Sequence, residues 1–235
     1  MAEDADIELA QEFGAIARTL IAEADSEATL QRIVSLAVEI IDGCEHAGIT
    51  VVEGNTVTSP ASSDEVPAIV DRIQAETGEG PCIDAIKEHQ LYQTGRLSAE
   101  LRWPEFTPRA VVESMIESIL SLRLFIVGTT MGALNLYSTQ PDAFDDRDVA
   151  VATVFAAHAA VAWSTAQTIE NLKVGMATRQ LIGQAVGLLM ARQDMSEAEA
   201  LDALRRASQR LNIKLRQLAE SIVRPSGAPS ATTEH

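Results

Sequence analysis

Residues 179–223 read RQLIGQAVGLLMARQDMSEAEALDALRRASQRLNIKLRQLAESIV, and this stretch decides the fold of the C-terminal part of the 235-residue chain. Ser196 followed by Glu199 is an S-x-x-E capping box, which predicts the start of a helix. The apolar positions after it recur at helical spacing, so we expect two short helices behind the end of a longer one. On the first short helix, one face carries Leu201, Leu204, Ala207, Ser208 and Leu211, and on the second the expected buried side is made of Leu215, Leu218, Ala219 and Ile222.

Asn212 lies where these two short helices must meet. Asparagine tolerates the left-handed conformation that ends a helix, and it also caps the start of one, so both roles are open. Pro225 and Gly227 follow the last apolar position, and the remaining tail is rich in Pro, Ser, Ala and Thr. We therefore expect residues 225–235 to be disordered.

A helical period also precedes this unit, from Asp145 or Asp146 to Arg192. We expect one long helix here; two helices with a break near Gly175 are the alternative. A helix of this length is rarely stable alone in water, so we expect it to pair with a second copy of itself, with a helix over residues 7–22 helping to cover it. The positions near one face are Val154, His158, Val161, Thr165, Ile169 and Leu172.

The N-terminal part alternates between helical and extended patterns, which predicts an α+β domain with an antiparallel sheet flanked by helices. Gly54-Asn55 is a turn signal between two β-branched runs, and Thr129-Thr130-Met131 is expected to connect a second hairpin. The expected helices cover 7–22, 26–42, 65–76, 82–88 and 105–114, and the expected strands cover 47–53, 56–58, 89–94, 121–128 and 132–138.

Charge is distributed unevenly along the chain, whose net charge is −16. Residues 170–224 hold nine basic and six acidic residues and are net +3, whereas residues 1–169 hold nine basic and 27 acidic residues and are net −18. Such an asymmetry indicates two roles, with the basic part closer to a polyanion.

Neither a membrane span nor a secretory signal is expected. The N-terminus is acidic, and the longest apolar run, Val149 to Trp163, is shorter than a span and is interrupted by His158. Cys44 and Cys82 have no metal-like spacing, so we expect a cytoplasmic protein with no metal site and no cofactor.

The stretch 179–223 resembles the ANTAR family of RNA-binding antitermination modules. Val186 departs from the pattern, because the family usually has a basic residue between the positions of Ala185 and Gly187. The matching residues are Arg179, Ile182, Gln184, Ala185, Gly187, Leu189, Met190, Ser196, Ala200, Leu204, Arg205, Arg206, Ser208, Asn212, Lys214, Leu215 and Ala219.

The preceding part resembles a GAF sensor domain of the subclass that actinobacterial regulators join to ANTAR. The resemblance implies a sensor domain over residues 8–165, joined by the long helix to an all-α three-helix ANTAR module over 166–224. The residues that carry it are Gly78-Glu79-Gly80-Pro81-Cys82, Arg102-Trp103-Pro104, Gly132 to Ser138, Phe144 and Ala156 to Ala160.

These resemblances imply a non-enzymatic regulator that binds two adjacent small RNA hairpins in nascent transcripts, as a homodimer, and promotes transcription antitermination. Arginine suits phosphate and unstacked bases, and the module has no aromatic residue for stacking. The candidate RNA-binding residues are Arg179, Gln184, Arg192, Arg205, Arg206, Ser208, Asn212, Lys214 and Arg216.

Cys82 and Trp103 are candidates for an unknown small-molecule pocket in the sensor domain. A helix start at Cys82 would lower its thiol pKa and favour a redox or ligand role, and a small buried apolar residue is the alternative. Trp103 could line the pocket or anchor the packing. Two other functions compete with RNA binding: a cysteine-dependent GAF reductase and a module that binds only protein.

Overall fold

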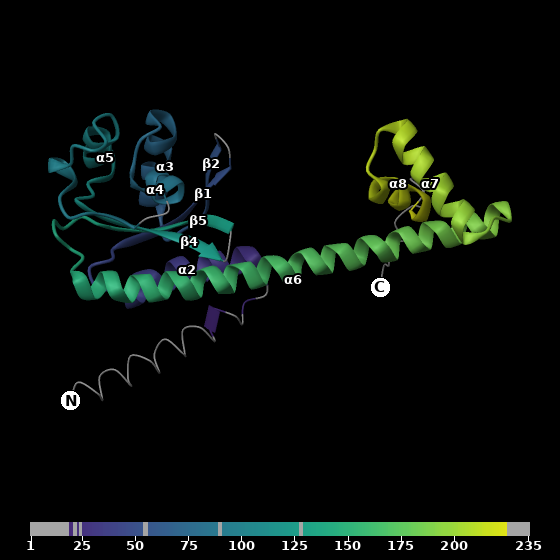
Figure 1. The fold of residues 1–235 in the computed structure, drawn as a ribbon, viewed down its shortest axis with the longest axis horizontal. Coiled ribbons are helices and arrows are strands. Elements are labelled where there is room, and N and C mark those ends of the chain that lie inside the picture. The colour runs from purple at the N-terminus through teal and green to yellow at the C-terminus, as the bar shows by residue number, and fades with distance from the viewer. Residues whose placement is uncertain are drawn as a thin grey trace, which may run out of the picture. The chain divides into compact units, whose positions relative to one another are not determined.

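The computed structural model describes residues 19–20, 23, 25–53, 56–88, 91–126 and 129–224. The helix expected over 7–22 and the disorder expected over 225–235 lie almost entirely or entirely outside these residues. The described contacts divide the chain into two compact units, with the division after Thr168 (Figure 1).

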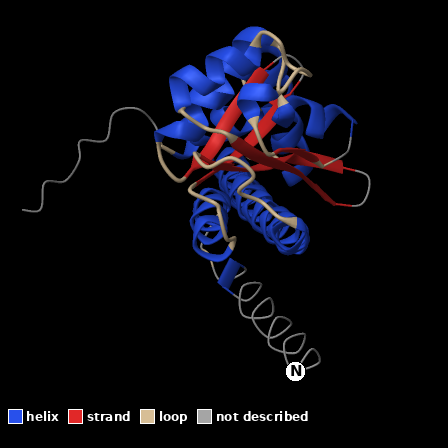
Figure 2. Cartoon of the chain, turned by 90° about the vertical axis from the view of Figure 1, so that its left-hand side faces the viewer, coloured by secondary structure: helices blue, strands red, loops and turns tan. Residues whose placement is uncertain are grey.

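The first unit is built on a five-stranded antiparallel sheet in the order β2-β1-β5-β4-β3. Figure 2 shows its strands in red between helices in blue. Its central strand β5 pairs on both sides, so that Leu134 lies opposite Ile49 on one neighbour and Leu122 on the other. The strands are β1 (His46–Glu53), β2 (Thr56–Ser62), β3 (Tyr92–Thr94), β4 (Ser118–Ile126) and β5 (Thr129–Ser138).

Helices cover both faces of this sheet, and the alternation along the strands separates two cores. Leu120 and Leu122 of β4 contribute to the core under α2 (Ser26–Ile40) and the start of α6 (Asp146–Gln193). Ile119 of the same strand and Tyr137 of β5 contribute to the other core. This second face is covered by α3 (Glu65–Thr77), α4 (Pro81–Glu88), a 3-10 turn (Leu97–Ala99) and α5 (Phe106–Ser114) (Figure 1).

Most of the expected elements are present, with small differences at their ends. Asp25 caps α2, because its Oδ1 accepts from the backbone N–H of Ala28 at 2.8 Å. The main correction concerns Thr129, Thr130 and Met131, which we expected to form a turn. They belong to β5, where Thr130 pairs with Phe125 across a register shift, because the pairing with β4 continues as far as Thr129, which lies opposite Ile126.

The second unit packs two short helices against the C-terminal part of α6. α7 (Glu197–Leu211) begins with the expected capping box, and α8 (Leu215–Val223) follows it. Asn212 ends α7 in the left-handed conformation, at φ 52° and ψ 41°, which selects one of its two expected roles. The fully buried residues of the described core here are three, Ala185, Leu204 and Ala219, and larger apolar side chains pack around them half-buried.

α6 is one helix of 48 residues that passes through Gly175, so the continuous form is confirmed. Among the described residues, this helix alone is long and apolar enough to cross a membrane by length and composition. We expected the run to Trp163 to be too short, and the unbroken helix extends it. Part of its apolar surface is buried in the core shared with α2 and the sheet, to which Phe155, Ala159 and Trp163 belong.

Candidate functional site

In the second unit, α7 carries exposed basic side chains on the side away from its buried residues. Ala200 and Leu204 are buried, and Arg205 and Arg206 are exposed on the far side of the same helix. Arg206 donates to Asp202 one turn earlier at 3.0 Å, with both side chains largely exposed. An exposed pair of this kind contributes little to stability, so Arg206 can exchange Asp202 for a phosphate at small cost.

Five other candidate residues of this unit are also exposed, namely Arg179, Gln184, Arg192, Lys214 and Arg216. Within the described part of the chain, no ion pair joins Arg179, Arg192, Arg205, Lys214 or Arg216 to an acidic side chain. Gln184 is exposed on α6 as well. Guanidinium groups without an acidic partner are available for bidentate contacts with phosphate.

Two of the candidate RNA-binding residues, Ser208 and Asn212, have structural roles at the junction of α7 and α8. The Ser208 hydroxyl donates to the carbonyl of Ile213 at 2.7 Å. The backbone N–H groups of Asn212 and Ile213 return to the carbonyls of Gln209 and Ser208, both at 3.2 Å. Ser208 and Asn212 therefore hold the turn, although the Asn212 side chain itself is exposed.

Val186 occupies a buried position, with 6% of its surface exposed. It follows Ala185, which is fully buried in the core of the unit. A basic residue at this position would have to bury its stem and bring its charge out past the packed helices. Valine removes one positive charge from the unit and packs its apolar surface instead.

The interior of the first unit contains a buried polar network that the sequence analysis did not single out. The Asp71 carboxylate accepts hydrogen bonds from Thr50 Oγ1 at 2.7 and 2.8 Å, from Ser59, and from Gln74 Nε2 at 3.2 Å. Asn135 Nδ2 donates to Thr50 Oγ1 at 2.8 Å. Burial raises the pKa of Asp71, and these hydrogen bonds oppose that shift.

A signal for this network was present in the sequence. Thr50 and Asn135 interrupt apolar stretches of β1 and β5, at positions that point to the face opposite Ile49 and Leu134. A polar residue in such a position must find a partner on the helices above it. The partner, Asp71, is recognisable only once α3 is placed over the sheet.

Cys82 is fully buried within this network. Gln74 Nε2 lies 2.9 Å from its Sγ, and its backbone N–H donates to Gln74 Oε1 at 3.0 Å. Burial raises the pKa of the Cys82 thiol to about 12, and the Asp71 carboxylate adds to the shift. The helix-start effect that we expected to lower this pKa is outweighed, because desolvation of a buried thiolate is the larger effect.

Cys82 lies behind a cavity rather than in its wall. The cavity has a volume of about 260 Å³ and is lined in part by Gln74, whereas Cys82 is not among its lining residues. Cys44 is also buried, and burial raises its thiol pKa to about 12. Both thiols therefore fit the alternative of small buried apolar residues. The residues that line the cavity in front of Cys82 are Val52, Val57, Gln74, Ala75, Gly78, Ile83 and Lys87.

Trp103 is 2% exposed and anchors the packing of the second core. Its indole Nε1 donates to Asp84 at 2.7 Å, and its ring meets Phe106 edge-to-face with centroids 6.3 Å apart. The Arg102 guanidinium lies 4.6 Å from the centre of the same ring. Among the described residues no group of His, Cys, Asp and Glu is arranged to hold a metal ion.

Family models match both units. A model described as GAF domain matches residues 23–164, and a model described as ANTAR domain matches residues 170–223. A comparison with curated proteins finds no match.

Solved structures share the fold of the first unit. The GAF domain of a phosphoenolpyruvate-protein phosphotransferase from Acinetobacter aligns with a TM-score of 0.55 and 13% identity, over 70% of this chain and 98% of that one. The equivalent Coxiella burnetii domain aligns with 0.55 and 14%, over 70% and 98%. Free methionine-R-sulfoxide reductase from Neisseria meningitidis aligns with 0.52 and 16%, over 67% and 89%. At these identities the likeness shows the fold alone.

Proposed function

Because this chain belongs to the GAF domain family and carries an ANTAR domain after it, we propose that it is a signal-responsive regulator that binds RNA and promotes transcription antitermination. One observation carries the proposal. The residues matched by the ANTAR model coincide with the three-helix unit that is net positive in a chain of net charge −16. The sequence-independent part of RNA affinity comes from such cations.

The proposed RNA contacts are made by side chains of α6, α7, the α7–α8 junction and α8, all of them exposed except the half-buried Ser208. Arg205 and Arg206 form the centre of the interface, and Arg guanidinium planes take the place of aromatic side chains against unstacked bases. The full proposed set is Arg179, Gln184, Arg192, Arg205, Arg206, Ser208, Asn212, Lys214 and Arg216.

We propose a homodimer through α6, so that two ANTAR domains meet two adjacent hairpins of a nascent transcript. In the first unit, Val154 and Val161 of this helix are 42% and 54% exposed. In the second unit, Ile169, Leu172 and Met176 are 47%, 62% and 69% exposed at three- and four-residue spacing. Exposed apolar side chains at such intervals support pairing with another helix.

The proposed role is regulatory and cytoplasmic, with the GAF domain controlling how the ANTAR domains pair. A cysteine-dependent reductase is the competing function, and some proteins of this fold have that activity by name. The buried Cys82, with its raised thiol pKa, counts against a thiolate nucleophile here.

The test is binding of the full chain to a synthetic RNA with two adjacent hairpins, measured by fluorescence anisotropy at several salt concentrations. Arg205→Ala/Arg206→Ala should weaken binding at least about tenfold and reduce the salt slope by about 1 for each of the two arginines that binds a phosphate in the wild-type complex. The matched control is Arg96→Ala/Arg147→Ala, which removes two exposed cations from the first unit.

Salt-dependent binding that survives in the control and falls in the Arg205/Arg206 variant supports the proposal. Absence of salt-dependent binding by the wild-type chain would overturn it. Protein binding by a folded C-terminal unit that ignores RNA would favour the interaction-only module.

A further inference from the structure

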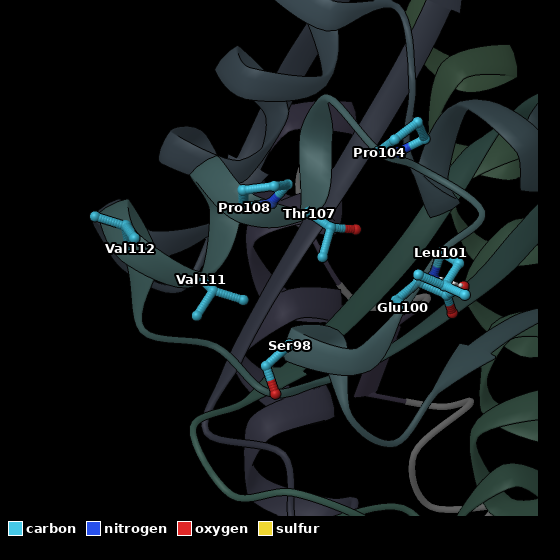
Figure 3. A pocket seen from close by; sticks show the side chains of 8 residues that line it. All are labelled: Ser98, Glu100, Leu101, Pro104, Thr107, Pro108, Val111 and Val112. Carbon is cyan, nitrogen blue, oxygen red and sulfur yellow. Dashed lines mark hydrogen bonds between the residues drawn. The ribbon is translucent and has the colours of Figure 1, made fainter.

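A cavity of about 520 Å³ lies on the outer side of α5, between this helix and the segment that leads into it (Figure 3). Leu101 and Pro104 of the leading segment and Pro108 and Val112 of α5 supply apolar walls. The volume falls in the range of small-molecule sites.

This cavity is separate from the interior between the sheet and its helices. α5 directs Phe106 and Ala110 into the second core, where both are fully buried. Val111 and Val112 lie on other faces of the same helix and line the cavity. The cavity is therefore distinct from the polar network around Asp71 and Cys82.

Two apolar side chains at the cavity are unusually exposed for their type. Leu101 is 88% exposed and Val112 is 80% exposed. Single exposed apolar residues are common, but here they border one cavity together with two prolines. Water at this place is in contact with apolar surface that a bound molecule would cover.

Thr107 gives the cavity a polar group that has no partner in the described structure. It is 6% exposed, its Oγ1 is buried, and no hydrogen bond to that oxygen is present. In the same helix the Ser114 hydroxyl donates to the carbonyl of Ala110 one turn back, at 2.6 Å. Figure 3 shows the Thr107 oxygen turned toward the side of the cavity that carries Leu101 and Glu100. Buried hydroxyl groups are normally hydrogen-bonded, so this one is available to a ligand.

The charge around the cavity limits what can bind. The Glu100 carboxylate at its edge accepts from the backbone N–H groups of Leu101 and Arg102, both at 2.9 Å, and pairs with the Arg102 guanidinium. The Arg102 hydrogen bond lowers the pKa of Glu100 to about 2, so the carboxylate is ionised at neutral pH. The described residues that line the cavity include no cation. An anionic ligand is therefore disfavoured.

We propose that this cavity binds a small neutral molecule with an apolar body and a carbonyl group, which accepts a hydrogen bond from the Thr107 hydroxyl. The body lies against Leu101, Pro104, Pro108 and Val112. This inference rests on the proposed sensor function, for which such a ligand would be the signal. Binding to the cavity is measured without RNA. A negative result for the cavity therefore leaves the RNA-binding proposal untouched, and a negative result for RNA leaves the cavity proposal untouched.

The probe for the test is prodan, a neutral naphthalene ketone whose emission shifts to the blue in apolar surroundings. Titration of the full chain should give saturable binding, and Thr107→Val should weaken it about fivefold to tenfold, which corresponds to one hydrogen bond. The same variant should melt at the wild-type temperature or above, because a methyl group replaces the unpartnered hydroxyl. A purely structural role for Thr107 would not give weaker binding together with retained stability.

Two controls make the result specific. Leu101→Asn should weaken binding several-fold, whereas Met115→Asn removes another exposed apolar side chain, 74% exposed and outside the cavity lining, and should leave it unchanged. 2-Dimethylaminonaphthalene, which lacks the carbonyl, should bind the wild-type chain and Thr107→Val equally. No saturable prodan binding, or equal prodan binding by wild type and Thr107→Val, would overturn the proposal.

Discussion

In the GAF domain, Asp71, Gln74 and Asn135 are buried and joined by hydrogen bonds, directly or through Thr50, whereas in the ANTAR domain Arg205 and Arg206 are exposed to solvent. The first domain has two extensive cores on the two faces of its sheet. The second has three fully buried residues in its described core, and they are small or medium in size. The comparison shows one domain that places polar groups inside a large core, and another that leaves its charges outside a small one.

The largest expected effect comes from the small core. Leu204→Ala should destabilise the ANTAR domain by about 2–5 kcal/mol, because Leu204 is the largest of its fully buried side chains. Hydrogen exchange should show loss of protection in α7 and α8 while the sheet remains protected. Leu211→Ala, on the same helix but 54% exposed, is the control and should change little. Equal loss of protection in the sheet would show that the two domains unfold together.

A smaller effect is expected from the buried network of the GAF domain. The folded-state pKa of Asp71 is raised by burial, so the folded state holds its proton to higher pH than the unfolded state does. The contribution of this group to stability is fully present below the unfolded pKa and is lost as pH rises through the folded pKa. Urea unfolding from pH 4 to pH 7 should therefore show a less negative dependence on pH for Asp71→Asn than for the wild type.

Asp146→Asn, at an exposed position, provides the matched control for that measurement. It should leave the pH dependence of stability close to that of the wild type over the same range. The same curve for Asp71→Asn and the wild type would mean that Asp71 titrates alike in the folded and unfolded states.

The smallest effect is expected at the start of α7. Ser196→Ala removes the side chain that accepts from the backbone N–H of Glu199, and it should cost about 1 kcal/mol. Asp25→Ala removes the equivalent cap of α2 and should cost about the same. The comparison predicts different consequences: Ser196→Ala should raise exchange throughout α7, and Asp25→Ala should affect only the first turn of α2. Similar changes of hydrogen exchange in α2 and α7 would contradict the expected difference in stability between the cores of the GAF domain and the core of the ANTAR domain.

The sequence predicted best what depends on neighbouring residues. The capping box at Ser196, the helix covering Glu65–Thr77 and the continuous α6 follow from local spacing, and the ANTAR match rests on one unbroken segment. The α+β class also followed, because the helical and extended periods alternate clearly along the first 140 residues.

What the sequence could not provide depends on residues distant along the chain. The Cys82 thiol pKa depends on burial under partners such as Gln74 and Tyr137, which only the fold brings together. The assignment of Thr129 and Thr130 to a strand depends on pairing with Ile126 and Phe125 of β4. The sequence likewise could not predict that the buried Thr107 hydroxyl has no hydrogen-bond partner, because this depends on how the segment that leads into α5 is placed beside it.

The small core of the ANTAR domain has a consequence for the proposed binding of RNA. A domain with so few fully buried residues has little folding free energy of its own, so a ligand that binds only the folded form makes up a large share of the total. By mass action, RNA at one hundred times its dissociation constant would add about 2.7 kcal/mol to that total. The transcript would then determine how much of the domain is folded, and proteolytic lifetime would rise and fall with the supply of RNA.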